Sequence, residues 1–117
     1  MSPQGAKSVE APPLARYRGP NGVEVEIRDE TSPYAYANIF HVRLRVEARV
    51  PGAAEPYGRQ LERVGVYSED LAQAQRELIE AFESRSLPYL FSNVFPRRFA
   101  EHLERKKSKV VRFPVQP

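Results

Sequence analysis

Few side chains in this sequence have the type and spacing that catalysis or metal binding requires. The chain contains two histidines, His41 and His102, and no cysteine. A metal site needs several convergent His, Cys, Asp or Glu side chains, and neither histidine has a partner at ligand spacing. The lack of cysteine also excludes thiolate nucleophiles, thiolate metal sites and disulfide scaffolds. We therefore expect no metal site and no cofactor, with His41 at the surface and His102 at the edge of the core.

The motifs that accompany nucleophilic or phosphate chemistry are missing from the sequence. It has no Gly-x-Ser-x-Gly segment, and its six glycines form neither a phosphate-binding loop nor a dinucleotide fingerprint. Two acidic pairs, Asp29-Glu30 and Glu69-Asp70, could act as general acid and base if burial separated their pKa values. Both pairs stand at the ends of predicted elements, where solvated or capping acids are common. We therefore expect a binding protein that is not an enzyme.

Cations are concentrated in two groups that could bind an anion. One group, from His41 to Arg49, lies on one side of a predicted strand, where arginines usually form a solvated face that discourages aggregation. The other group lies near the C-terminus, where cations neutralise phosphates but also offset the dipole of a helix. The candidate anion-binding residues in this second group are Arg97, Arg98, Arg105, Lys106, Lys107 and Lys109.

The composition is that of one globular domain. The chain has 117 residues, of which 41% are hydrophobic and 28% charged, with a formal net charge of +3. Residues 1–20 are rich in Pro, Gly, Ser and Ala without a helical or strand period, which predicts a flexible arm. We expect a single α+β domain over residues 21–114 and a tail over residues 115–117.

Three stretches alternate between apolar and polar residues, as half-buried strands do. They span residues 23–27, 40–50 and 57–67, and the second and third are joined by turn-prone residues that predict a hairpin. In the third stretch Leu61 and Val66 lie on opposite phases, so we expect a bulge at or beside Gly65 that shifts the register.

Two helices are predicted after the strands. Ser68 is a good N-cap for the first, whose apolar residues from Leu71 to Phe82 follow a helical spacing. Ser92 or Asn93 can cap the second, in which Phe95, Phe99 and Leu103 form the buried side. Residues 109–114 then predict a short extended piece, which could add a C-terminal strand.

These elements predict an antiparallel sheet of three to four strands in the order β-β-β-α-α, with two helices packed on one face. We expect the apolar side of this sheet to be larger than two helices can cover. The remainder would accommodate a bound guest or a second copy of the chain, so a homo-oligomer is expected.

The central hairpin resembles that of the SecB-type export chaperones. The resemblance is carried by FHVRLRVEARV at residues 40–50 and LERVGVYS at residues 61–68. In that family a Gly, an aliphatic residue and an aromatic close the second strand, as Gly65-Val66-Tyr67 do here. A helical stretch then leads to a Pro-x-x-Leu-Phe type segment, and PYLF stands at residues 88–91. The resemblance covers roughly residues 23–114.

The resemblance implies a non-enzymatic, oligomeric holdase or adaptor that binds extended polypeptide. The residues it places near a binding groove are Tyr57, Tyr67, Tyr89 and Phe91, although ordinary core and hairpin packing is the more common role for any one of them. The alternative is a basic adaptor that binds nucleic acid or another anionic partner through the C-terminal Arg/Lys region.

The N-terminal residues predict no export and no membrane partner. Residues 1–15 carry polar residues and prolines where a signal peptide needs an apolar run, and no later stretch is long and apolar enough to span a bilayer. Together with the lack of cysteine, this predicts a cytoplasmic protein.

Overall fold

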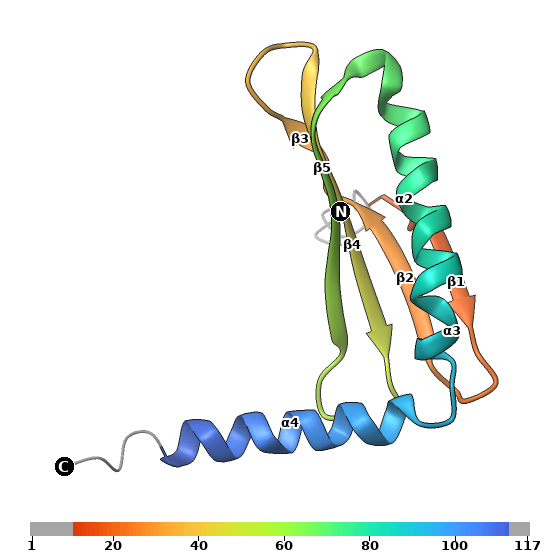
Figure 1. The fold of residues 1–117 in the computed structure, drawn as a ribbon, viewed down its shortest axis with the longest axis vertical. Helices are drawn as coiled ribbons and strands as arrows, with labels where there is room; N and C mark the ends of the chain where they lie inside the picture. The colour runs from red at the N-terminus through yellow and green to blue at the C-terminus, as the bar shows by residue number, and fades with distance from the viewer. Residues whose placement is uncertain (1–10, 113–117) are drawn as a thin grey trace, which may run out of the picture.

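The computed structural model describes residues 11–112, and the side chains of residues 11–107. The strands precede the helices in the sequence, which confirms the α+β class (Figure 1). The elements are β1 (Ala15–Arg18), β2 (Glu24–Asp29), β3 (Ser32–Pro33), β4 (Ile39–Arg49), β5 (Tyr57–Tyr67), the short 3-10 helix η1 (Ser68–Asp70), α2 (Leu71–Arg85), α3 (Leu87–Leu90) and α4 (Phe95–Arg112).

All the strands belong to one antiparallel sheet. Strand β1 pairs with β2, and β2 pairs with one side of β4. The two-residue β3 pairs with the beginning of β4 on that same side, while β5 pairs with the other side over its whole length. Within the described part of the chain, β4 is the only strand that pairs with β5, so the outer edge of β5 is free.

The apolar residues of the three predicted strands share one face of the sheet, which α2 covers. The alternation of the sequence explains this, because successive side chains of a strand point to opposite faces. The buried residues are Val23, Val25, Ile27, Val42, Leu44, Val46, Ala48, Val50, Leu61 and Val66 from the sheet side, and Ala74, Phe82, Leu90, Phe95 and Phe99 from the helix side.

The prediction that this apolar face is larger than the helices can cover is wrong. Each of its ten buried sheet-side residues is less than 9% exposed in a single copy of the chain. Two contributions to the cover were not foreseen: Leu90 of the short helix α3 is itself buried in the core, and Tyr17 of β1 packs against Phe82. The sheet face therefore offers no open apolar groove.

A bulge at Gly65 confirms the predicted change of phase in β5. Gly65 has a φ of +79°, and the pairing of β4 with β5 shifts its register between Phe40 and His41. A left-handed φ suits glycine because it lacks a Cβ. The shift turns Val66 into the core but leaves both Val64 and Tyr67 about half exposed, at 52% and 50%.

Three predicted boundaries need correction. The prediction of a flexible arm is wrong over Ala15–Arg18, where Ala15 and Tyr17 alternate with arginines and form β1. Residues 1–10 of the predicted arm lie outside the described residues. The prediction of an extended piece is wrong over residues 109–112, because these residues continue α4. Helix α4 leads away from the sheet (Figure 1), so none of the strands within residues 11–112 lies beside this end of the helix. Ser68 does not cap α2, since η1 intervenes and no side chain caps either helix.

Strand β1 is tied to α2 by a hydrogen bond that depends on pH. The Tyr17 hydroxyl donates to Glu83 Oε2 over 2.7 Å. Desolvation raises the pKa of Tyr17 above its ordinary value of 10.0, and the hydrogen bond to Glu83 and the Glu83 charge act in the same direction. The folded state thus favours the protonated phenol. Its contribution to stability is complete below about pH 10 and is lost as the pH rises further.

Replacement of Tyr17 by Phe should therefore remove a pH dependence as well as a hydrogen bond. We expect Tyr17→Phe to lower the free energy of unfolding by about 1 kcal/mol near neutral pH. Above about pH 10 the difference between variant and wild type should shrink, because the phenol of the unfolded wild-type chain then ionises while the folded state still holds its proton. Urea unfolding at about pH 8 and about pH 11 measures both effects. A difference that stays the same at both pH values would contradict this role of Tyr17.

Candidate polypeptide-binding site

A hollow of about 390 Å³ lies where the beginning of β5 meets α4. The residues just before and at the start of β5 form one wall, Tyr89 of α3 lies at one end, and the first turns of α4 form the other wall. We call it the aromatic hollow, after the four rings that line it: Tyr57, Tyr89, Phe95 and Phe99.

The two tyrosine rings meet the phenylalanine rings edge to face. The Tyr57 ring meets the Phe95 ring at 5.5 Å and the Phe99 ring at 5.9 Å, both nearly perpendicular. The Tyr89 ring meets Phe95 in the same way at 5.4 Å. Such pairs stabilise beyond the area they bury, because the positive ring edge meets the negative ring face.

The depth of the rings decides which of them a ligand could reach. Phe95 and Phe99 stand one helical turn apart and stack at 5.7 Å on the inner side of α4, so both are buried. Tyr89 is 46% exposed and keeps part of its ring open to solvent. The hollow therefore has a rigid aromatic floor and one accessible tyrosine.

Basic side chains form one rim of the aromatic hollow. Arg98, His102 and Lys106 all line it, and all three are exposed. They follow one another at intervals of four residues, so they form a row along α4 next to the row of Phe95 and Phe99. The opposite rim carries the carboxylate of Glu55.

From the hollow, the free edge of β5 runs toward the bulge at Gly65. An unpaired strand edge presents backbone N–H and C=O groups to which another extended chain can pair. Two arginines of β5 are directed to the helix layer instead of over this edge. Arg59 Nη1 donates to Ser86 Oγ over 2.7 Å, and Arg63 Nη1 donates to Glu77 Oε1 over 2.8 Å.

The partner of Arg63 is held ionised by its donors. The hydrogen bond from Arg63 lowers the pKa of Glu77 below its ordinary value, and a second one from Gln73 Nε2 adds to the effect. The carboxylate therefore keeps its charge, and the Arg63 side chain stays directed toward α2.

The structure brings the two predicted groups of site residues together in part. Tyr57 and Tyr89, predicted for peptide binding, line the same hollow as Arg98 and Lys106, predicted for anion binding. Of the other predicted cations, Arg97, Arg105 and Lys107 are exposed on α4 but do not line this hollow, and the side chain of Lys109 lies outside the described residues.

Two predicted aromatics lie elsewhere. The ring of Phe91 fits against Gly19 in the turn between β1 and β2, where a Cβ would overlap the ring. Tyr67 is at the opposite end of β5 from Tyr57, about 30 Å away at the usual rise per strand residue. It lies near the exposed loop that carries Tyr34 and Tyr36.

Sequence reasoning also missed the part played by His102 and Glu55. His102 was expected at the edge of the core, whereas it is exposed and lines the hollow. The spacing of Arg98, His102 and Lys106 was a usable signal, because residues four apart share a helix face. Glu55 carries no comparable signal, since it lies in the turn before β5.

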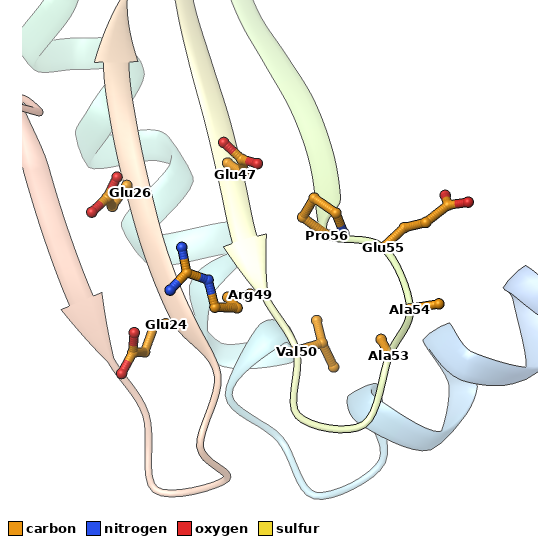
Figure 2. Close-up of a pocket in the computed structure, with 9 residues that line it drawn as sticks. All are labelled: Glu24, Glu26, Glu47, Arg49, Val50, Ala53, Ala54, Glu55 and Pro56. Carbon is orange, nitrogen blue, oxygen red and sulfur yellow. The ribbon is translucent and has the colours of Figure 1, made fainter. Parts of the chain in front are cut away.

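A second hollow, of about 350 Å³, lies on the polar face of the sheet. Figure 2 shows that Arg49 points into the gap between Glu24 and Glu26, while Glu55 points away from them. Glu26 forms ion pairs with Arg16 at 3.1 Å and Arg28 at 3.0 Å. These carboxylates are engaged by arginines, so this hollow is the weaker candidate for a binding site.

Among the residues that the structure describes, no three His, Asp or Glu side chains are grouped so that they could hold a metal ion. No helix within residues 11–112 has the length and apolar character needed to cross a membrane. No protein-family model matches the sequence, and neither a curated protein nor a solved structure is significantly similar to it.

Proposed function

We propose that this chain is a non-enzymatic protein that binds extended polypeptide, as a SecB-like holdase or adaptor in the cytoplasm. The observation that carries the proposal is that the free edge of β5 begins at the aromatic hollow. A client strand would pair with the backbone of β5 and place an apolar side chain against Tyr57 and Tyr89. Main-chain pairing supplies affinity for many sequences, and the hollow supplies selectivity.

The binding surface in this proposal is a strand edge and not the face of the sheet. The apolar face is covered in a single copy of the chain, so it cannot serve as the floor of a groove. The edge of β5, in contrast, lacks proline and carries no lysine, two of the residues that usually block strand addition. A second copy of the chain could pair with the same edge when no client is bound, so the proposed homo-oligomer would compete with a client for β5.

A basic adaptor for nucleic acid is the second candidate, because Arg98 and Lys106 stand beside the exposed ring of Tyr89. Cations of this kind neutralise phosphates, and an open aromatic ring can stack on a base. The carboxylate of Glu55 on the opposite rim counts against it, since it would repel a phosphate chain. Binding of nucleic acid would also leave the free edge of β5 unused.

Tyr89→Ala tests the proposal at the residue that a client would touch. We expect the wild type to suppress aggregation of an unfolded model protein at equimolar chain concentration. Tyr89→Ala should weaken binding of an unfolded reporter peptide about tenfold, because the client side chain loses an aromatic contact surface. Fluorescence anisotropy of the labelled peptide measures the dissociation constant.

Tyr36→Ala is the matched control, because Tyr36 is 71% exposed in the loop beyond the far end of β5. It should bind the reporter as the wild type does. Equal losses in the two variants, or no protection by the wild type, would reject the proposal. Tight binding of a single-stranded oligonucleotide that weakens steeply with salt would favour the second candidate.

A further inference from the structure

We infer that the polypeptide bound at the aromatic hollow is acidic, with carboxylates that follow its apolar anchor and lie along Arg98, His102 and Lys106. This inference rests on the proposed function and names the chemistry of its client. The anchor would contact Tyr89 and Tyr57, and the next residues would leave the hollow along α4.

The direction of α4 makes such a path available. Figure 1 shows that α4 crosses the end of the strands and extends beyond β5, away from the rest of the molecule. The row formed by Arg98, His102 and Lys106 starts at the hollow and runs along the helix in this direction. A chain that leaves the hollow on this side therefore meets basic side chains one helical turn apart.

The cations of this row are available to a ligand. Among the side chains of residues 11–107, neither Arg98 nor Lys106 forms an ion pair, whereas the arginines on β1, β2 and β5 include four that do. The two acidic residues in the described part of α4, Glu101 and Glu104, do not line the aromatic hollow. Glu55 is the acidic residue that lines the hollow, on the opposite rim, so a ligand carboxylate that lies along α4 would meet a net positive charge.

The same charges argue against the other occupants. A second copy of α4 would bring Arg105, Lys106 and Lys107 against identical cations, and like charges at close range destabilise a complex. Glu55 on the opposite rim disfavours nucleic acid, which carries a phosphate at every residue, whereas the polypeptide places its uncharged apolar anchor in the hollow. An acidic polypeptide satisfies both features, because its backbone can pair with β5 while its carboxylates meet α4.

Three labelled peptides with the same apolar core test the inference. Their flanking residues are glutamate in the first, serine in the second and lysine in the third. At low salt we expect the wild type to bind the glutamate peptide about tenfold more tightly than the serine peptide, and the lysine peptide most weakly. The double variant Arg98→Glu, Lys106→Glu should reverse this order.

The control is the double variant Arg45→Glu, Arg76→Glu, which makes the same change in net charge at two exposed positions that line neither hollow. It should keep the wild-type order. Equal affinity of the wild type for all three peptides, or the same reversal in the control, overturns the inference and leaves the proposed function standing. Failure of every peptide to bind rejects the proposed function itself. Loss of peptide binding through self-association of the chain, seen as a rising mass in light scattering, also overturns the inference.

Discussion

Phe95→Ala is expected to lower the free energy of unfolding by about 3–5 kcal/mol, the largest effect of any single substitution proposed for this chain. Phe95 is 3% exposed and contacts the rings of Tyr57, Tyr89 and Phe99. Its removal leaves a cavity at the junction of β5, α3 and α4, and the aromatic hollow loses its floor. Peptide binding should fall with it. Urea unfolding followed by circular dichroism measures the loss of stability.

Phe95→Leu separates packing from aromatic chemistry. Leucine fills most of the space, so this variant should lose about 1–1.5 kcal/mol only. Tyr89 would nevertheless lose its perpendicular ring partner and become more mobile, so binding should weaken more than stability does. A Phe95→Ala variant that is as stable as the wild type would show that the junction is not packed as described.

The alternation of the sequence was sufficient to predict the central strands. From Phe40 to Val50 every second residue is apolar, and the structure buries Val42, Leu44, Val46, Ala48 and Val50 on one face. The bulge at Gly65 was predictable for the same reason, because a change of phase within a strand requires an extra residue. Local patterns of this kind do not depend on the rest of the fold.

The short strands and the course of α4 were not predictable by the same means. Strand β1 has only four residues in a segment whose prolines and glycines indicate a flexible chain, and it forms because β2 offers an edge to pair with. Residues Val110 and Val111 favour strands locally, but α4 carries them away from every strand. In both cases a tertiary neighbour, or its absence, decided the local structure.

The candidate site could be predicted as residue types but not as an assembly. Tyr57, Tyr89 and Phe95 are far apart in the sequence, and their meeting depends on how α3 turns the chain back to the start of β5. Tyr67 shows that the sequence also grouped residues that the fold keeps apart. It shares a strand with Tyr57 and was grouped with it, yet the length of β5 separates the two.

Asn21→Ala is expected to lower the free energy of unfolding by about 2–3 kcal/mol, because this one side chain fastens the connection between α3 and α4 to the sheet. The Asn21 Nδ2 donates to the carbonyl oxygens of Leu90 at 2.9 Å and Ser92 at 2.8 Å. Its Oδ1 accepts from the backbone N–H of Val23 at 3.1 Å. Alanine leaves all three backbone groups without this partner. Amide hydrogen exchange should increase in α3 and the first turn of α4 before it increases in the sheet.

Asn21→Asp distinguishes these hydrogen bonds from the conformation of the turn. Aspartate suits a turn about as well as asparagine and keeps the acceptor for Val23. It replaces the amide donor with an oxygen that faces the carbonyls of Leu90 and Ser92, so two attractive contacts become repulsive. We therefore expect Asn21→Asp to be at least as destabilising as Asn21→Ala near neutral pH, and less so when acid protonates the new carboxylate. If the aspartate variant were as stable as the wild type, the turn alone would matter, and α4 would be held in place by Phe95 and its aromatic neighbours.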